Sequence, residues 1–281
     1  MTHLILQSPS LSSEHAEKIA AIVGAQGLRQ LDNTAVMLMD VDVAEKEAAL
    51  RECSVLHLDH AFLEKRQALQ DCRILAMDMD STLINIECID EIADVAGRKP
   101  EVAAITEAAM RGEIKDFAES LRRRVALLEG VPAQALEEVY SKRLQLNAGA
   151  ERLIATAKQA GLKVLLVSGG FTFFTDRLRT RLELDQTRSN VLEIENGLIT
   201  GRVLGHIVDA QGKADSLRAL AAETGAQPHQ IIAMGDGAND LKMLALADYS
   251  VAYRAKPIVQ AQASFALNYS GLDAVLNWFE Q

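Results

Sequence analysis

The segment Asp78-Met79-Asp80-Ser81-Thr82 directly follows the apolar run Ile74-Leu75-Ala76-Met77 and decides the fold class of this chain. A continuous apolar run of this length is typical of a buried strand, so two carboxylates emerge one residue apart where the strand ends. Carboxylates this close raise each other's pKa unless a positive charge lies between or beside them. The pattern therefore indicates either a solvated acidic turn or a place where a divalent cation and a phosphate ester bind together.

Two further apolar runs end in polar chemistry of the same kind. Residues 164–167 lead into Ser168-Gly169-Gly170, and residues 231–234 lead into a glycine-rich turn that contains Asp236. Strand ends of an open parallel sheet line its ligand-binding crevice, so these three ends are expected to converge. Magnesium prefers oxygen ligands and takes one or two carboxylates with phosphate and water. The sequence therefore predicts a Mg²⁺ site formed by Asp78, Asp236 and a backbone carbonyl.

Two residues are candidates for holding the phosphate. Ser168 opens a glycine-bearing turn between a strand and a helix, where a hydroxyl and free N–H groups can bind phosphate oxygens. Lys213 begins a helix expected over residues 213–224 and can supply a fixed positive charge. Each residue also has a simpler explanation, Ser168 as a helix N-cap and Lys213 as a solvated lysine. Transfer of a phosphoryl group to a carboxylate needs all of these parts, because the repulsion between the two anions must be neutralised.

The chain is predicted to be an α/β protein with two domains. Residues 1–70 form a small α/β unit, and residues 71–281 form a larger domain with a parallel sheet. The core of the larger domain comprises residues 71–84 and 148–281. The almost wholly helical residues 85–147 are inserted directly after a strand end, which predicts a helical-bundle cap rather than a sheet crossover.

Hydrophobic periodicity and turn residues give the expected elements. The first unit is expected to have strands at 4–6, 35–39 and 54–58 and helices at 13–24 and 44–53, in a β-α-β-β-α-β order that resembles the small amino-acid-binding ACT domain. The cap helices are expected near residues 88–97, 101–111, 115–129 and 133–146. Asn196-Gly197, between two apolar runs, predicts a hairpin.

Composition excludes several function classes. The formal net charge of −10 argues against binding to nucleic acids through phosphate neutralisation. The three cysteines, Cys53, Cys72 and Cys88, lack metal-ligand spacing and suggest reduced thiols in the cytoplasm. No apolar run approaches the ~20 residues that span a bilayer, and the N-terminus lacks the pattern of a signal peptide. A cytoplasmic protein that acts on a small molecule is expected.

The order Asp-x-Asp-x-Thr, Ser, Lys and Gly-Asp-Gly-x-x-Asp resembles the haloacid dehalogenase superfamily of phosphatases over residues 74–281, with no departure at a motif position. The resemblance implies a HAD-like Rossmannoid parallel sheet with an inserted cap. It also implies that Asp78 is the nucleophile that forms a phospho-aspartate, and that Asp80 is the general acid and base.

The resemblance extends to the remaining site residues. It implies that Ser168 and Lys213 hold the transferring phosphoryl group and that Asp236 completes the Mg²⁺ site, to which Asp80 lends its backbone carbonyl. Asp240 is expected to support the metal or Lys213 from outside the first set of ligands.

The cap is expected to select the substrate. A phosphorylated amino acid needs a negative partner for its ammonium and a positive partner for its carboxylate. Glu87 lies just beyond the catalytic loop, and Arg122, Arg123 and Arg124 form a basic cluster on a helix. Helix-dipole stabilisation would explain Glu87 equally well, and a solvated face would explain the arginines.

Within the superfamily, the segments that contain the motif residues and the candidate cap residues are similar to those of the members that hydrolyse O-phospho-L-serine. Those members act in the last step of serine biosynthesis. That similarity implies that Glu87 binds the ammonium and Arg124 the carboxylate. It also implies that Gly169 contacts the phosphate and that Asn239 lines the pocket.

Several alternatives stay open. The enzyme could act on another small phosphomonoester, could transfer the phosphoryl group to an alcohol such as homoserine, or could be an amino-acid sensor with an inert phosphatase-like half. The first domain could bind serine as a feedback ligand or form a homodimer contact. Asp40-Val41-Asp42 repeats the first spacing after an apolar run, but Ala44 replaces the threonine, and the sequence predicts only a solvated strand end there.

Overall fold

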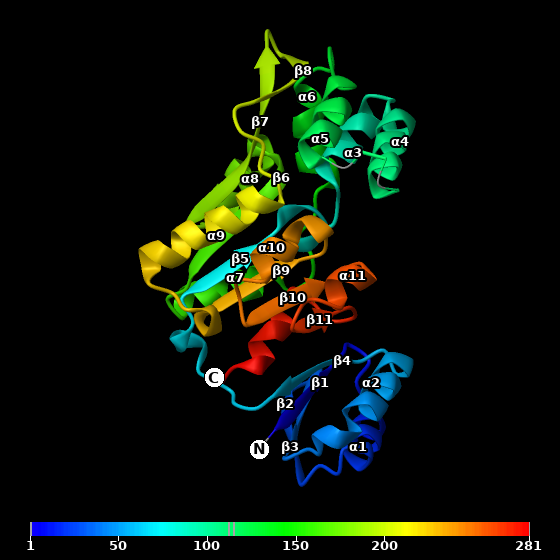
Figure 1. Ribbon diagram of the computed structural model, residues 1–281, viewed down its shortest axis with the longest axis vertical. Coiled ribbons are helices and arrows are strands. Elements are labelled where there is room, and N and C mark those ends of the chain that lie inside the picture. The colour runs from blue at the N-terminus through cyan, green and yellow to red at the C-terminus, as the bar shows by residue number, and fades with distance from the viewer. Residues whose placement is uncertain (1, 112, 115, 281) are drawn as a thin grey trace.

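The computed structural model describes residues 2–111, 113, 114 and 116–280. Eleven strands within this part of the chain form one sheet, in the order β2-β3-β1-β4-β11-β10-β9-β5-β6-β7-β8, which runs along the long axis of the molecule (Figure 1). The strands are β1 His3–Gln7, β2 Gly27–Asp32, β3 Ala35–Met39, β4 Asp59–Leu63, β5 Ile74–Met77, β6 Lys163–Phe171, β7 Gln186–Glu195, β8 Leu198–Leu204, β9 Ile231–Gly235, β10 Tyr249–Tyr253 and β11 Phe265–Leu267.

The sheet is mixed, with a parallel centre. The strands from β11 to β7 in the sheet order are parallel to their neighbours, whereas β8, β4 and the remaining strands pair antiparallel. The helices are α1 Ser13–Ile22, α2 Lys46–Val55, α3 Cys88–Val95, α4 Lys99–Met110, α5 Phe117–Ala126, α6 Gln134–Glu138, α7 Ala150–Gln159, α8 Thr172–Leu182, α9 Ala210–Thr224, α10 Leu241–Leu244 and α11 Pro257–Gln260. None of them has the length and hydrophobicity of a membrane-spanning segment.

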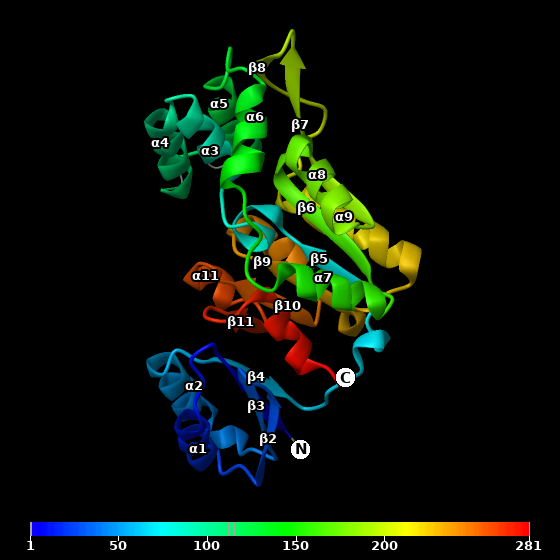
Figure 2. The same cartoon turned by 180° about the vertical axis from the view of Figure 1, so that it is seen from behind.

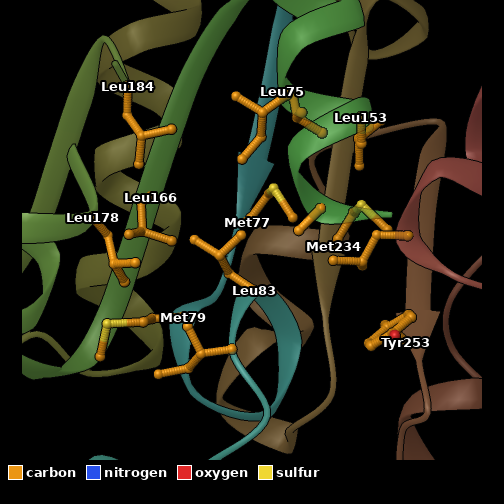
Figure 3. Packing of buried hydrophobic residues seen from close by; sticks show 14 of the residues in the cluster. Leu75, Met77, Met79, Leu83, Leu153, Leu166, Leu178, Leu184, Met234 and Tyr253 are labelled. Atoms are coloured by element: carbon orange, nitrogen blue, oxygen red, sulfur yellow. The ribbon is translucent and has the colours of Figure 1, made fainter. Parts of the chain in front are cut away.

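The central strand β5 is buried on both faces. Leu75 and Met77 pack with residues of α7 and α8 on one face (Figure 3), and Ile74 and Ala76 pack with residues of α9 and α10 on the other. Strand residues alternate between faces, so a run without polar residues requires cover on both sides. This double cover fixes the end of β5 at the centre of the molecule.

The helices α3 to α6 follow β5 and lie beyond the carboxyl edge of the central strands, next to the β7–β8 hairpin (Figure 2). The hairpin turn contains Asn196 and Gly197, both with positive φ, as the sequence predicted. Ile199 of β8 exchanges two backbone hydrogen bonds with the chain after α5, donating to Val131 and accepting from Gly130. Residue 115, where one cap helix was expected to begin, lies outside the described residues.

The first unit has the predicted β-α-β-β-α-β order, and its sheet is covered on both faces. Leu4, Leu6 and Leu38 pack with residues of α1 and α2. Ile5 on the opposite face belongs to the same cluster as Trp278, near the C-terminus. Among the described residues, one residue pair, His60 of β4 with Ala266 of β11, joins the strands of this unit to the central strands of the sheet.

The strand expected at 54–58 is wrong. Helix α2 continues to Val55, Leu56 caps it, and His57 takes a positive φ of 55° before β4 begins at Asp59. Val55, Leu56 and Leu58 are apolar, and apolar residues suit the end of a helix as well as a strand. Periodicity alone therefore did not distinguish the two structures. The sequence reading had no strands at residues 27–32 and 265–267, where β2 and β11 lie.

Candidate active site

Asp78 follows β5 directly, and its carboxylate is almost fully buried. One carboxylate oxygen, Oδ2, lies 2.7 Å from Lys213 Nζ, and the other, Oδ1, accepts a 2.7 Å hydrogen bond from the Met79 N–H. Burial and the nearby Asp240 raise the pKa of Asp78, while Lys213 acts in the opposite direction. The side chain is therefore held in one orientation at the carboxyl edge of the sheet.

Lys213 is fully buried in the first turn of α9, between two carboxylates. Its Nζ lies 2.7 Å from Asp78 and 2.7 Å from Asp240, whose second oxygen accepts from the Gly237 N–H. Burial alone would lower the pKa of Lys213, but Asp240 and Asp78 raise it above its ordinary value. A buried ammonium is costly unless it is paired and hydrogen-bonded, and here both conditions hold. The lysine carries a permanent positive charge.

Asp80 has different partners from Asp78. In the turn from Met79 to Leu83, Asp80 (φ −62°, ψ 135°) and Ser81 (φ 56°) depart from helical geometry. Asp80 accepts hydrogen bonds from the Cys88 N–H at 2.8 Å and from the Ser168 hydroxyl at 3.2 Å. Burial raises its pKa, which favours the protonated form. The two acids of the motif therefore have different surroundings.

The glycines after Ser168 allow close packing around this acid. A Cβ on Gly170 would lie 2.8 Å from Asp80 Oδ2, and a Cβ on Gly169 would lie 2.8 Å from the ring of Phe117 in α5. Any larger residue would push the loop away from Asp80 or the helix away from the loop. Gly170 also donates its N–H to Ser168 Oγ at 2.8 Å.

A cation would fit beside Asp78. Carboxylate oxygens of Asp78, Asp236 and Asp240 lie within 4.8 Å of one another. Burial raises the pKa of Asp236 to about 6, with Asp240 adding to the shift. Asp78 and Asp236 line the cavity, whereas Asp240 is fully buried between Lys213 and the Gly237 N–H, so the first two are the more accessible to a metal. Oxygen donors of this kind suit Mg²⁺, and its charge would relieve the repulsion between the carboxylates.

The helical segment lies across the same cavity, which has a volume of about 720 Å³. Glu87 precedes α3 and accepts a 2.6 Å hydrogen bond from the Ser81 hydroxyl. Water reaches Glu87 through the open cavity, but the surrounding walls desolvate it in part, and Asp80 is close, so its pKa rises to about 7. Arg124 of α5 is half-buried, and burial lowers its pKa. A carboxyl group just before α3 and a guanidinium on α5 thus line the same cavity.

The predicted site residues gather in one place. Those that line the cavity are Asp78, Asp80, Glu87, Arg124, Gly169, Asp236 and Asn239. Ser168 and Lys213 are buried in its wall, in contact with Asp80 and Asp78.

The sequence reading missed cavity residues that include Asp116, Phe117 and Lys256. Lys256 follows β10, so applying the strand-end argument to that strand would have found it. Asp116 caps α5 by accepting from the Ala118 N–H, and its sequence signal is that of an ordinary N-cap.

Comparisons with known proteins show which families this chain resembles. The haloacid dehalogenase-like hydrolase family matches residues 75–245, and a domain of unknown function matches residues 4–49. A phosphoserine phosphatase from a Polaromonas species is 62% identical over 205 residues, which cover 72% of this chain and 87% of that protein.

Two solved structures have similar folds. The unliganded crystal structure of a probable phosphoserine phosphatase from Vibrio cholerae matches with a TM-score of 0.84 and 40% identity, over 99% of this chain and 85% of that chain. A phospho-aspartyl intermediate analogue of phosphoserine phosphatase matches with a TM-score of 0.69 and 36% identity, over 74% of this chain and 99% of that chain.

Proposed function

The chain belongs to the haloacid dehalogenase-like hydrolase family, and we propose that it hydrolyses O-phospho-L-serine to L-serine and phosphate through a phosphorylated Asp78. One observation carries this proposal. A single cavity is lined by Asp78, which is held by a buried lysine, and by Glu87 and Arg124. Asp78 with its lysine is suited to phosphoryl transfer, and Glu87 with Arg124 offers opposite charges to an amino acid.

In the first step, a carboxylate oxygen of Asp78 attacks phosphorus and the bond to the serine oxygen breaks. The raised pKa of Asp80 keeps a proton available for that leaving oxygen. In the second step, Asp80, now ionised, takes a proton from the water whose oxygen attacks phosphorus; the bond between phosphorus and Asp78 breaks, which releases phosphate and restores the Asp78 carboxylate. Lys213 and Ser168, together with the Gly169 N–H, are the groups we assign to the phosphoryl oxygens.

Magnesium belongs to the same proposal. Asp78, Asp236 and the backbone carbonyl of Asp80 would hold Mg²⁺, which would neutralise negative charge on the phosphate and on the carboxylates. Burial, with Asp240 adding to the shift, raises the pKa of Asp236 to about 6, and a bound cation would favour its ionised form. Asp240 holds Lys213 in place at 2.7 Å.

The amino-acid end of the substrate would be bound by the helical segment. We assign Glu87 to the ammonium and Arg124 to the carboxylate, since a guanidinium can bind a carboxylate through two N–H groups. Asn239 would contact the substrate from the opposite wall. Residues 85–147 would then act as a cap that selects the substrate.

The remaining assignments complete the proposal. Residues 1–70 would be an ACT-like domain beside a phosphatase domain of residues 71–281, and the protein would act in the cytoplasm in the last step of serine biosynthesis. A homodimer contact through the first domain would be visible as a doubled mass in light scattering.

A panel of phosphate esters tests the function. Phosphate release should be fastest with phosphoserine, slower with phosphothreonine and slowest with sugar phosphates, and it should require added Mg²⁺. Release without an acceptor alcohol would exclude an obligatory transfer to homoserine. Equal rates on all esters would contradict the assigned roles of Glu87 and Arg124, and no release from any ester would support an inert sensor.

A further inference from the structure

Asp90 is a cavity residue to which the proposed function gives no role. It lies in the first turn of α3, three residues after Glu87, and lines the same cavity. An acid in the first turn of a helix is favourable by itself, which explains its presence there. It does not explain why Asp90 Oδ1 is buried with no hydrogen-bond partner among the described residues. A buried polar atom without a partner is costly, so its position calls for a charge opposite to it.

Arg124 lines the same cavity and can supply that charge. Its Nε makes one long hydrogen bond, 3.4 Å, to the backbone oxygen of Ser120. Its neighbour Arg123 differs, because it is exposed and forms an ion pair with Glu119 one turn earlier on α5. Both Asp90 and Arg124 lie on the cavity wall, on helices that lie near each other in Figure 1.

The electrostatics favour an interaction between the two groups. Burial lowers the pKa of Arg124, and among the nearby charges Asp90 opposes that effect most strongly. Burial raises the pKa of Asp90, and Arg124 opposes that most strongly. Each of the two groups is thus the main compensating charge for the other.

We propose that Asp90 is a positioning residue for Arg124, which orients one edge of the guanidinium so that the other edge can bind the substrate carboxylate. A guanidinium has five N–H donors in a fixed plane, enough for a protein carboxylate and a substrate carboxylate together. Without Asp90, Arg124 would sample other rotamers and would bind the substrate less often in the productive orientation. This inference rests on the proposed function, because it concerns the carboxylate end of the same substrate.

Three substrates distinguish an effect on the carboxylate of the substrate from an effect on its ammonium. Phosphoserine carries both an ammonium and a carboxylate, O-phosphoethanolamine lacks the carboxylate, and 3-phospholactate has a hydroxyl in place of the ammonium. For Asp90→Asn we expect kcat/KM to fall about tenfold on phosphoserine and 3-phospholactate, mainly because KM rises. Losing a residue that orients a binding group typically has an effect of this size. Activity on phosphoethanolamine should change less than about twofold. Asp90→Glu should restore part of the loss.

A double variant tests whether Asp90 acts through Arg124. In an Arg124→Ala background, Asp90→Asn should cause no further loss on phosphoserine, because the group that it positions is gone. Asp94→Asn removes a charge from the same helix, where Asp94 pairs with Arg143, and it should leave the ratio between the three substrates unchanged. Thermal unfolding of each variant distinguishes misfolding from a change at the site.

Several results would overturn the inference. An equal loss on phosphoethanolamine with none on 3-phospholactate would mean that Asp90 binds the ammonium, and an equal loss on all three substrates would mean that it serves the phosphate or the fold. A full additional loss in the Arg124→Ala background would mean that Asp90 acts independently. A wild-type enzyme that does not prefer phosphoserine to phosphoethanolamine would instead overturn the proposed function, and this is seen before any variant is made.

Discussion

Two segments of this chain carry the same Asp-x-Asp spacing after a strand, yet their surroundings differ. Asp78 is buried and lies 2.7 Å from Lys213, whereas Asp42 is exposed and caps a short turn by accepting from the Ala44 N–H. Asp40 has a positive φ of 52°, and its buried Oδ1 has no partner among the described residues.

Strand direction accounts for the difference. Strand β5 lies between β6 and β9, and both are parallel to it. Their carboxyl ends therefore bring Ser168 and Asp236 to the same edge as Asp78. Strand β3 lies between β1 and β2, and both are antiparallel to it. Their carboxyl ends therefore lie at the opposite edge. A pair of acids becomes a candidate site only where parallel neighbours deliver further groups beside it.

The largest expected effect is the loss of activity in a variant of Asp78. If the Asp-x-Asp spacing alone made a site, the matched change in the other segment would have a similar effect. Asp78→Asn should reduce kcat for phosphoserine by roughly 10⁴-fold or more, because an amide cannot form the phospho-enzyme. Asp40→Asn, the matched change in the other segment, should leave kcat within about twofold. Phosphate release measures both, and mass spectrometry after a rapid quench detects the phosphorylated protein. Turnover of Asp78→Asn close to that of the wild type would rule out Asp78 as the nucleophile.

Neighbouring arginines extend the comparison from strands to a helix. Arg124→Ala should lower kcat/KM for phosphoserine on the order of 10²-fold, the effect of losing about 1.5–3 kcal/mol of charged hydrogen bonding. A simple aryl phosphate should lose much less, since it has no carboxylate. Arg123→Ala is the matched control, because Arg123 pairs with Glu119 outside the cavity. Equal losses on both substrates would assign Arg124 to the phosphate or to the fold.

The same reasoning shows what the sequence could and could not predict. Asp78, Ser168 and Asp236 were predictable together, because apolar runs that end in polar residues reveal parallel strand ends. The end of α2 was not predictable, because Val55 and Leu58 suit both a helix end and a strand. Asp90 also gave no signal, since its role depends on the distance between two helices, which no local pattern encodes.

The carboxylate of Asp59 is expected to affect the stability of the fold and not the reaction. Asp59 of β4 is buried and accepts backbone N–H groups from Asn268, Tyr269 and Ser270, which follow β11. Asp59→Asn replaces one acceptor oxygen with a donor and should lower the free energy of unfolding by about 1.5–3 kcal/mol, with kcat unchanged. Urea unfolding measures the first quantity. Asp71→Asn, at an exposed side chain, is the control. A loss of kcat without a loss of stability would show that the first unit acts on the active site.

The smallest expected effect concerns the second acid of the non-catalytic segment. Asp42→Ala removes the hydrogen bond of 2.9 Å to the Ala44 N–H and should lower the free energy of unfolding by about 0.5–1 kcal/mol. Asp42→Asn keeps an acceptor oxygen at the cap and should be nearly neutral, because asparagine and aspartate are similar N-cap residues. Neither variant should change kcat, since β3 has no parallel neighbour whose end could complete a site. A fall in kcat for both variants, at unchanged stability, would mean that the charge of Asp42 acts in the reaction and that strand direction does not separate the two segments.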